Sequence, residues 1–537
     1  MLPFITRFGK LMIALFVLSL LLTASSATAE AWKFGVMSDT QWKANLDGQN
    51  PNSVAVGIIN QLNQEFIDKD VRFVIQVGDL TDNGSSVAMT TRADAAGALY
   101  NAGICFYPLR GNHESSQAAA LQFQSLYPQS QGTGTTCAAA NFTSPFPVLN
   151  GLSYAFYYNN ARFVLLDQFT RTDGTNYLGS SNNNIVDQQA WINAVLAGKP
   201  AYSHTFVFGH KNLIGQNHVD TLFGANPASN PDAQNAFIGS LAAAGVRYVF
   251  GGHDHMHHRS MMKSPDGSSS VQEIIGASNS YKFYIPQIPA NDVTYDMPAF
   301  GGTRETPVMQ ELFTIGYYIV TVDGPRVTVD YYAAPNGCNG DCDLAVTPAL
   351  TFSKRETFGY SLNGREFLVP EGGSYTVVQD RFQETSASIL DGTNDSSSKD
   401  YAGRSFTQTV DTGWTSSEDD RFASSILTLW GMEKSLGSTD TANYVLSISY
   451  DERRVRPEHQ GSGGFGIAAK DRSGAWVNAV DLNIGGTKRF VKGSWKPGYE
   501  LGTYGVDPSS HTAWAVLNYN SDFAVARDIE PVPGHRK

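Results

Sequence analysis

Polar side chains in the first half of the sequence are of types that hold metal ions and move protons, and they occur in short motifs. The motifs are Asp39-Thr40-Gln41, Gly78-Asp79, Gly111-Asn112-His113-Glu114, Gly209-His210 and Gly252-His253-Asp254-His255. Carboxylates can bridge two cations, imidazoles suit zinc, iron or manganese, and an amide adds a neutral oxygen. Two metal ions about 3.5 to 4 Å apart can clamp a phosphate and activate water near neutral pH. The residue types therefore predict hydrolysis at a dinuclear metal centre.

The elements that must position these side chains are strands, because each motif follows a short apolar run. The chain alternates such runs with helical patterns from Trp32 to about Tyr332, which predicts a layered α/β domain. The carboxyl ends of strands in such a sheet lie at one edge, so distant residues can converge there. We expect strands at 71–77, 205–208 and 246–250, a hairpin over 154–167 that turns at Asn159-Asn160, and helices at 187–197, capped by Asp187, and 233–244, ended by Gly245.

The ordered motifs resemble the calcineurin-like metallophosphoesterase superfamily, which includes purple acid phosphatases and phosphodiesterases. The family pattern is Asp-x-His, Gly-Asp, Gly-Asn-His-Asp/Glu, a single His and Gly-His-x-His, and the match covers roughly residues 32 to 335. The resemblance implies a four-layer α/β domain in which helices flank two central sheets. It also implies a phosphoester substrate, attack by a metal-bound hydroxide, and two divalent or trivalent ions of zinc, iron or manganese.

The same resemblance assigns roles to individual residues. Asp79 would bridge both metals, and Asn112, His210 and His253 would complete one site, while Asp39 and His255 would complete the other. His113 would face the substrate and stabilise the transition state or protonate the leaving oxygen. Glu114 or a neighbouring acid would orient His113.

Gln41 departs from the family pattern, which often has a metal-binding histidine there. A glutamine amide is a weaker ligand than imidazole for zinc-class metals, so we expect a weaker or differently occupied first site. An exposed glutamine that binds no metal is the alternative for this position. Gln41 also motivates a second hypothesis, an exported binding or adhesion protein with a degenerate phosphoesterase domain.

Other polar residues of this region receive structural interpretations. We expect His257 and His258 to be loop or substrate-rim residues, with metal ligation as the alternative, and His204 and His218 to be packing or surface residues. Lys211 could contact a substrate phosphate, but we expect it to be solvated. The run 461–466 matches G-x-G-x-x-G, but no buried strand precedes it and no helix of sufficient length follows.

The chain of 537 residues exceeds a single hydrophobic core, so we expect more than one domain. Residues 1–29 have the pattern of a cleaved signal peptide, ending in Ala27-Thr28-Ala29, so the product would be periplasmic or secreted with no membrane span.

The catalytic domain is expected at 30–345, and a β-sandwich-like domain at 350–537, with strands near 444–450 and 513–519. Losing Arg7 and Lys10 takes the net charge from -12 to -14, which argues against a nucleic-acid surface.

The cysteines favour disulfides, since an exported protein meets an oxidising compartment. We expect Cys105 to pair with Cys137 and Cys338 with Cys342. A metal site that uses Cys338 and Cys342 is the alternative, although no further thiolate or imidazole follows them.

Overall fold

A computed structural model describes most of the chain. It covers residues 30–43, 48–134, 137, 140–173, 175, 185–287, 304–337, 344–417, 419–461 and 463–529. The predicted signal peptide and the predicted Cys338–Cys342 pairing lie outside the described residues. Within these ranges, no helix is long and apolar enough to cross a membrane.

The first sheet carries the N-terminal motifs on parallel strands. Its order is β14-β13-β12-β1-β2-β3, and β1, β2 and β3 run parallel. The strands are β1 (Trp32–Met37), β2 (Phe73–Gln76), β3 (Cys105–Pro108), β12 (Thr314–Asp323), β13 (Arg326–Pro335) and β14 (Ser353–Ser361). Helices α2 (Val56–Asp68), α3 (Ser86–Ala95), α4 (Gly97–Asn101) and α5 (Gln117–Leu126) cover its outer face. Helix α2 does so with Ile58, Ile59, Leu62 and Phe66, which share one helical face.

The second sheet carries the later motifs. Its order is β11-β9-β10-β8-β7-β6-β5-β4, with β6, β7, β8 and β10 parallel. The strands are β4 (Ala140–Thr143), β5 (Tyr154–Tyr158), β6 (Ala161–Leu166), β7 (His204–Gly209), β8 (Tyr248–Gly251), β9 (His257–Lys263), β10 (Ser270–Ile275) and β11 (Glu305–Glu311). Helices α6 (Gln189–Ala197) and α7 (Pro231–Ala243) lie on its outer face. The predicted hairpin at Asn159-Asn160 is confirmed as β5–β6.

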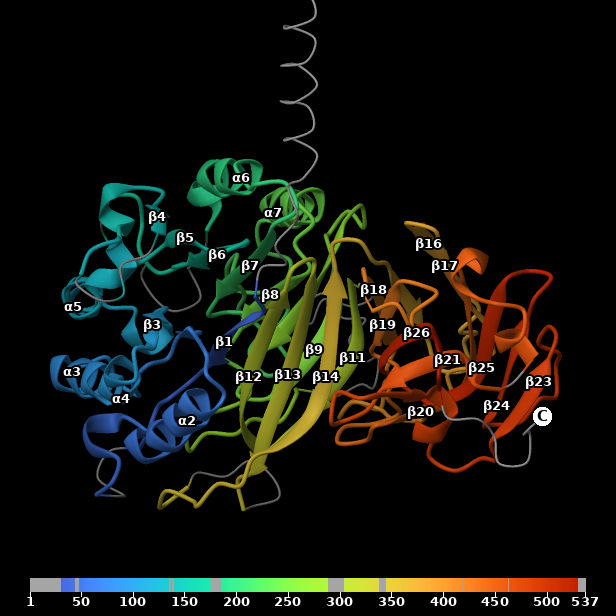
Figure 1. Cartoon of the computed structure of the whole chain (residues 1–537). Helices are drawn as coiled ribbons and strands as arrows, with labels where there is room; N and C mark the ends of the chain where they lie inside the picture. Colours follow the sequence, from blue (N-terminus) through green and yellow to red (C-terminus); the bar gives the residue numbers. More distant parts are fainter. Residues whose placement is uncertain are drawn as a thin grey trace, which may run out of the picture.

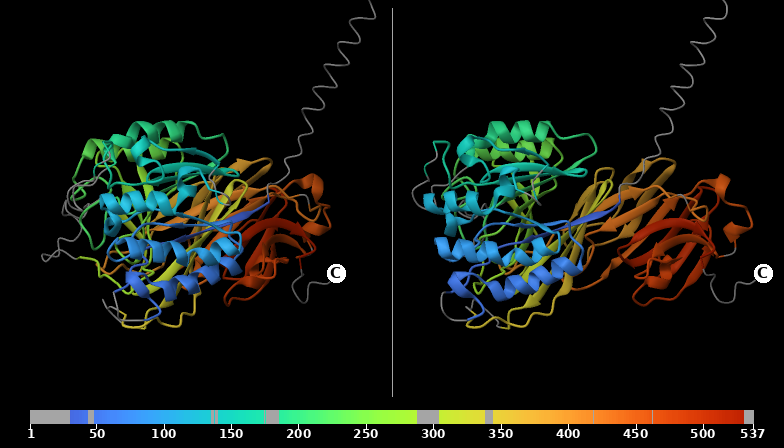
Figure 2. Two further views of the ribbon diagram at one scale, coloured as in Figure 1. Left: turned by 90° about the vertical axis from the view of Figure 1, so that its left-hand side faces the viewer. Right: turned by 60° about the vertical axis from the view of Figure 1, so that its left-hand side comes forward.

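The two sheets face each other across a core rich in aromatic side chains. Phe34 of the first sheet meets Phe163 and Phe206 of the second with ring centroids 5.1 and 5.0 Å apart. The order helix, sheet, sheet, helix confirms the predicted four-layer α/β architecture (Figures 1 and 2).

The C-terminal part is built from two further sheets that pack face to face. Their orders are β15-β18-β19-β26-β21-β22 and β16-β17-β20-β25-β24-β23, and both contribute to one buried core. The strands are β15 (Glu366–Val369), β16 (Val377–Phe382), β17 (Thr385–Gly392), β18 (Gln408–Thr415), β19 (Ile426–Trp430), β20 (Asp440–Ser449), β21 (Phe465–Lys470), β22 (Trp476–Asn478), β23 (Arg489–Lys492), β24 (Thr503–Asp507), β25 (Thr512–Tyr519) and β26 (Asp522–Arg527). A β-sandwich-like arrangement was expected here, and these sheets confirm it. The domain limits at 345 and 350 stay a prediction; β14, which follows them, pairs with β13 in the first sheet.

The structure also tests the predicted disulfide and the predicted cap of helix α6. The predicted Cys105–Cys137 disulfide is confirmed, and it ties the start of β3 to the segment before β4. The expected cap at Asp187 is wrong, because the chain first makes a 3₁₀ turn over Val186–Gln188. Helix α6 then starts at Gln189, and Asp187 lies inside the turn rather than before the helix.

Candidate metal centre

The predicted motifs converge where parallel strands of both sheets end. Asp39 follows β1, Asp79 follows β2 and Asn112 follows β3, all from the first sheet. His210 follows β7 and His253 follows β8, from the second. Asp39, Asp79, His253 and His255 have positive φ values of 48°, 44°, 72° and 54°. Such backbone conformations are costly for side-chain-bearing residues and cluster at functional sites.

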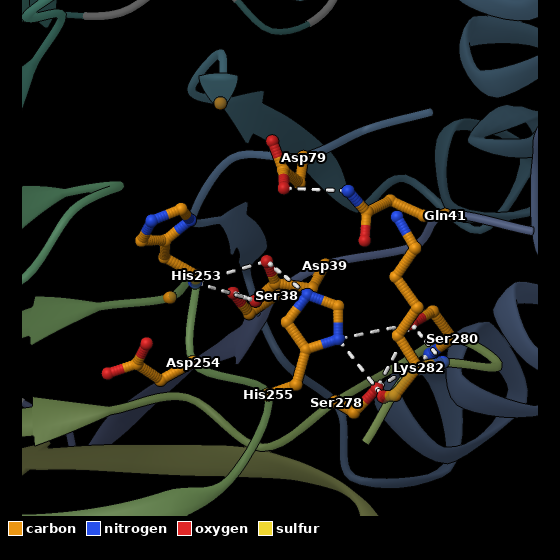
Figure 3. A network of polar contacts seen from close by, with 12 residues as sticks. Ser38, Asp39, Gln41, Asp79, His253, Asp254, His255, Ser278, Ser280 and Lys282 are labelled. Carbon is orange, nitrogen blue, oxygen red and sulfur yellow. Dashed lines mark hydrogen bonds and ion pairs between the residues drawn. The ribbon is translucent and has the colours of Figure 1, made fainter. Parts of the chain in front are cut away.

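Carboxylate and imidazole groups of this site form two overlapping clusters. Figure 3 shows Asp39, Asp79, His253 and His255 of these clusters. One contains Asp79, His210 and His253, and the other contains Asp39, Asp79 and His255. In each cluster one potential ligand atom per residue lies within 4.8 Å of the others, and all these residues are buried. Asp79 belongs to both clusters, so its carboxylate lies between two potential cation positions.

The imidazoles of His210 and His255 are held so that one nitrogen faces a carboxylate. His210 Nδ1 lies 3.0 Å from the carbonyl oxygen of Val77, and His255 Nδ1 lies 3.0 Å from that of Lys282. A carbonyl only accepts, so each Nδ1 carries hydrogen. His210 Nε2 then lies 3.3 Å from Asp79 Oδ1, and His255 Nε2 lies 3.4 Å from Asp39 Oδ1.

The oxygen atoms around Nε2 of His210 suit a bound cation. Its Nε2 lies 2.9 Å from Asn112 Oδ1, and two acceptor atoms this close need a proton or a cation between them. Burial disfavours the charged imidazolium, but Asp79 outweighs it and raises the pKa of His210 to about 9. The same proximity of imidazoles lowers the pKa of Asp79 well below its usual value, against the effect of burial.

Gln41 lies inside the site and is fully buried. Its Nε2 donates to Asp79 Oδ2 at 2.7 Å, while its Oε1 is buried without a hydrogen-bond partner. An unpaired buried amide oxygen costs free energy, so this atom fits a cation bound beside Asp79. The alternative of an exposed glutamine does not hold.

Two motif glycines leave the space that the site needs. A Cβ at Gly111 would lie 1.9 Å from Asp79 Oδ1, and a Cβ at Gly78 would lie 2.2 Å from His210 Nδ1. Gly78 also has a φ of 82°, which favours glycine. Both glycines are therefore required for Asp79 and His210 to take their positions.

The family model of calcineurin-like phosphoesterases matches residues 33–257. This segment is a calcineurin-like phosphoesterase domain. It contains every residue of the two clusters.

Solved structures give distant likenesses. The chain is similar to a dimetal phosphatase from Danio rerio, with 16% identity, a TM-score of 0.36, and coverage of 58% of this chain and 97% of that chain. It is also similar to a purple acid phosphatase from yellow lupin (Lupinus luteus) seeds, with 12% identity and a TM-score of 0.40. The match covers 60% of this chain and 57% of that chain. A third likeness is to GAP50, the anchor in the inner membrane complex of Plasmodium, with 11% identity, a TM-score of 0.34, and coverage of 59% and 91%. No curated protein matches the chain by sequence.

His113 lies beside the carboxylate shared by the clusters of the phosphoesterase domain. Its Nε2 is 3.8 Å from Asp79 Oδ2, and its Nδ1 is 2.6 Å from the carbonyl oxygen of Asp82. Asp82 therefore orients this ring. Glu114 instead accepts backbone N–H groups of Leu80, Thr81 and Gly111, so it shapes the turn that carries Asp79.

A second group of residues in the phosphoesterase domain supports His253. Asp220 Oδ1 lies 3.3 Å from His253 Nε2, and Asp220 also accepts a hydrogen bond from Lys211 Nζ. Lys211 is buried, so its expected solvation is wrong; the carboxylate of Asp220 compensates its charge. His218 stacks on His253 with centroids 4.0 Å apart, and its Nδ1 lies 2.8 Å from Asp254 Oδ1.

His257 and His258 are not rim residues. Both are fully buried in β9, where His257 Nε2 lies 2.9 Å from Glu356 Oε2 and His258 Nε2 lies 2.7 Å from Glu305 Oε1. The expectation was wrong because these acids come from distant strands, β14 and β11. Those carboxylates supply hydrogen-bond partners that the buried imidazoles need.

Sequence reasoning missed the segment that follows β10. Strand β10 runs parallel to β8, so its end brings residues 278–282 to the same edge of the sheet. The carbonyl oxygen of Lys282 accepts from Ser278 Oγ at 2.7 Å and lies against His255. No histidine or aspartate marks this segment, but the apolar end of β10, Ile274-Ile275, is the signal that could have found it.

Proposed function

We propose that this chain is an exported, metal-dependent phosphoric ester hydrolase acting on phosphomonoesters or phosphodiesters. The observation that carries the proposal is the sharing of Asp79 by the two buried clusters at the strand ends of the phosphoesterase domain. A carboxylate between two sets of nitrogen and oxygen donors suits two cations held side by side. When bound, such cations would polarise phosphoryl oxygens and lower the pKa of water.

The ligand assignment follows the donor atoms. Asp79, Asn112, His210 and His253 would hold one ion, and Asp39, Asp79 and His255 would hold the other, with Gln41 Oε1 as its additional oxygen. Zinc, iron and manganese all accept such mixed nitrogen and oxygen sets. The pairing of Asp220 with His253 Nε2 leaves Nδ1 of that ring for the centre.

His113 is the proposed proton donor. Because its Nδ1–H is engaged by the carbonyl oxygen of Asp82, its Nε2 remains free for the substrate. In the imidazolium form, Nε2–H would donate to the leaving oxygen, and such general-acid assistance contributes about 10² to 10⁴ in rate.

Export is the remaining part of the proposal. The leader pattern at residues 1–29 supports it, and the Cys105–Cys137 disulfide is compatible with an oxidising compartment. An N-terminal sequence of the mature product that still begins at Met1 would contradict cleavage.

The alternative of a degenerate binding protein rested on Gln41. In the structure Gln41 donates to Asp79 of the cluster, and its Oε1 is buried without a hydrogen-bond partner, which suits a metal ligand. This observation favours the enzyme over the alternative.

The proposal is tested by measuring turnover of p-nitrophenyl phosphate and bis(p-nitrophenyl) phosphate by the metal-reconstituted protein. We expect turnover with zinc, manganese or iron, loss of turnover after chelation, and metal analysis near two ions per chain. Asp79→Asn should lose bound metal and activity together, and His113→Ala should keep its metal but lose about 10² to 10⁴ in kcat.

Matched controls are Asp187→Asn and His511→Ala, which alter exposed side chains far from the cluster. Both should retain metal and turnover. If the unmodified protein and the Asp79→Asn variant are equally inert with all three metals, the chain is not a phosphoesterase.

A further inference from the structure

A lysine that the family motifs do not include lies at the edge of the metal centre. Lys282 is in the segment after β10, and its backbone is anchored through its carbonyl oxygen to Ser278 Oγ and His255 Nδ1. Its backbone N–H donates to Ser280 Oγ at 3.2 Å. The backbone of Lys282 is therefore tied to His255, a proposed metal ligand, whereas its side chain does not take part in holding His255 (Figure 3).

The ammonium group of Lys282 lies beside His113. It donates to Asp82 Oδ1, and the same carboxylate oxygen accepts from the hydroxyl of Tyr281 at 3.2 Å. Asp82 Oδ1 is in turn 3.8 Å from His113 Nδ1. Asp82 thus joins the ring that faces the shared carboxylate to a positive charge on the neighbouring segment.

The side chains of Lys282 and Asp82 are more exposed than those of the buried clusters. Their side chains are 16% and 25% exposed, and that of His113 is 25% exposed, whereas the side chains of Asp39, Asp79 and His255 are 0%, 2% and 2% exposed. Among these groups, His113 and the ammonium group are therefore the ones that a substrate can contact from solvent. A lysine on a flexible stem can exchange one anionic partner for another at such a place.

We infer that Lys282 binds an oxygen of the substrate phosphoryl group and makes this centre selective for phosphomonoesters over phosphodiesters. The inference rests on the proposed function. A monoester dianion carries one more negative charge than a diester, and this charge gains most from a partly desolvated cation. Asp82 holds the ammonium group in place when no substrate is bound.

The test compares two substrates with one leaving group, p-nitrophenyl phosphate and bis(p-nitrophenyl) phosphate. Lys282→Met should lower kcat/KM for the monoester by roughly 30-fold to 100-fold and for the diester by no more than about threefold. Lys282→Arg should recover most of the monoester activity because it restores the charge. Lys263→Met, which changes an exposed lysine of β9, is the matched control and should alter neither value.

Binding of inorganic phosphate, measured by calorimetry on the metal-loaded protein, is a readout independent of turnover. Lys282→Met should weaken this binding by about tenfold with unchanged metal content. Asp82→Asn separates substrate binding from a structural role, because it removes the partner of Lys282 but keeps the carbonyl group that holds His113. Its preference for the monoester should persist.

Several outcomes would overturn the inference. Equal losses for both substrates in Lys282→Met, or an Asp82→Asn variant that behaves like Lys282→Met, would assign Lys282 to positioning alone while leaving the proposed function intact. A natural preference for the diester would also contradict it. Absence of turnover of either substrate would instead remove the proposed function on which it rests.

Discussion

At the scale of single residues, the position of Gln41 decides how the metal centre should be understood. The sequence has an amide where the resemblance leads us to expect an imidazole, and the structure shows that this amide is buried against Asp79 with an unpaired oxygen. An oxygen donor of this kind is a weaker ligand than imidazole for zinc-class metals. The ion between Asp39 and His255 should therefore be the more loosely held of the two.

Gln41→His should strengthen that site. We expect the affinity for the weaker zinc ion to rise on the order of tenfold, because imidazole is the better zinc ligand. Calorimetric titration of metal-free protein in the presence of a competing chelator measures this affinity. Gln41→Met is the companion variant and should weaken the same site; unchanged affinity in both variants would show that residue 41 does not bind metal.

At the scale of elements, the two sheets are joined by polar contacts as well as by the aromatic core. His204 of β7 is buried, with its Nε2 2.9 Å from the carbonyl oxygen of Gly324 and its Nδ1 3.0 Å from the hydroxyl of Tyr360 in β14. The carbonyl requires hydrogen on Nε2, so Nδ1 accepts from Tyr360. Both nitrogens are satisfied only in the neutral ring.

This arrangement makes stability depend on pH. Burial lowers the pKa of His204 from 6.5 to about 4, so between these values the unfolded chain binds a proton that the folded protein does not. Stability therefore falls as the pH decreases from 6.5 towards 4, by up to about 3 kcal/mol from this residue. Urea unfolding across this range should show a smaller pH dependence in His204→Gln than in the unmodified protein. Identical pH dependences would contradict the assignment.

At the scale of the whole molecule, the C-terminal sheets are attached to the two N-terminal sheets through buried charged and polar side chains. Strand β14 contacts β18 and β19, and Figure 1 shows these strands side by side. Arg259 of β9 donates to Glu356 Oε1 of β14 at 2.5 Å and to Thr409 Oγ1 of β18 at 2.8 Å. Arg404 similarly donates to Glu305 Oε2 of β11 at 2.7 Å. A hydrogen bond from Arg259 to Thr409 and an ion pair between Arg404 and Glu305 thus connect both halves.

Removing one partner of this network should destabilise the protein. Arg259→Met leaves the buried Glu356 carboxylate with His257 as its remaining ionic partner, and loss of one member of a buried pair costs about 3 to 5 kcal/mol. Chemical denaturation measures the change. Arg381→Met breaks an exposed pair with Glu384 and should cost no more than about 1 kcal/mol. Similar small changes in both variants would contradict a bracing role for Arg259.

Much of the site could be predicted from the sequence because its chemistry is local. The proposed metal ligands lie within a few residues of strand ends, and glycines stand where the backbone comes close to them, so Gly78-Asp79 and Gly252-His253 are recognisable from neighbouring residues alone. The layered α/β fold follows from apolar runs in the same way. These features depend on spacing along the chain, which the sequence determines by itself.

Tertiary structure decided what depends on residues far apart in sequence. His257 and His258 are buried because Glu356 and Glu305 reach them from other strands, and no local pattern indicates such partners. Lys282 reaches Asp82 across a separation of 200 residues because β10 ends at the same sheet edge as β8. The sequence by itself determined the motifs that we propose to bind metal. Only the packing of the sheets decided which charges surround them, since charge compensation acts through space rather than along the chain.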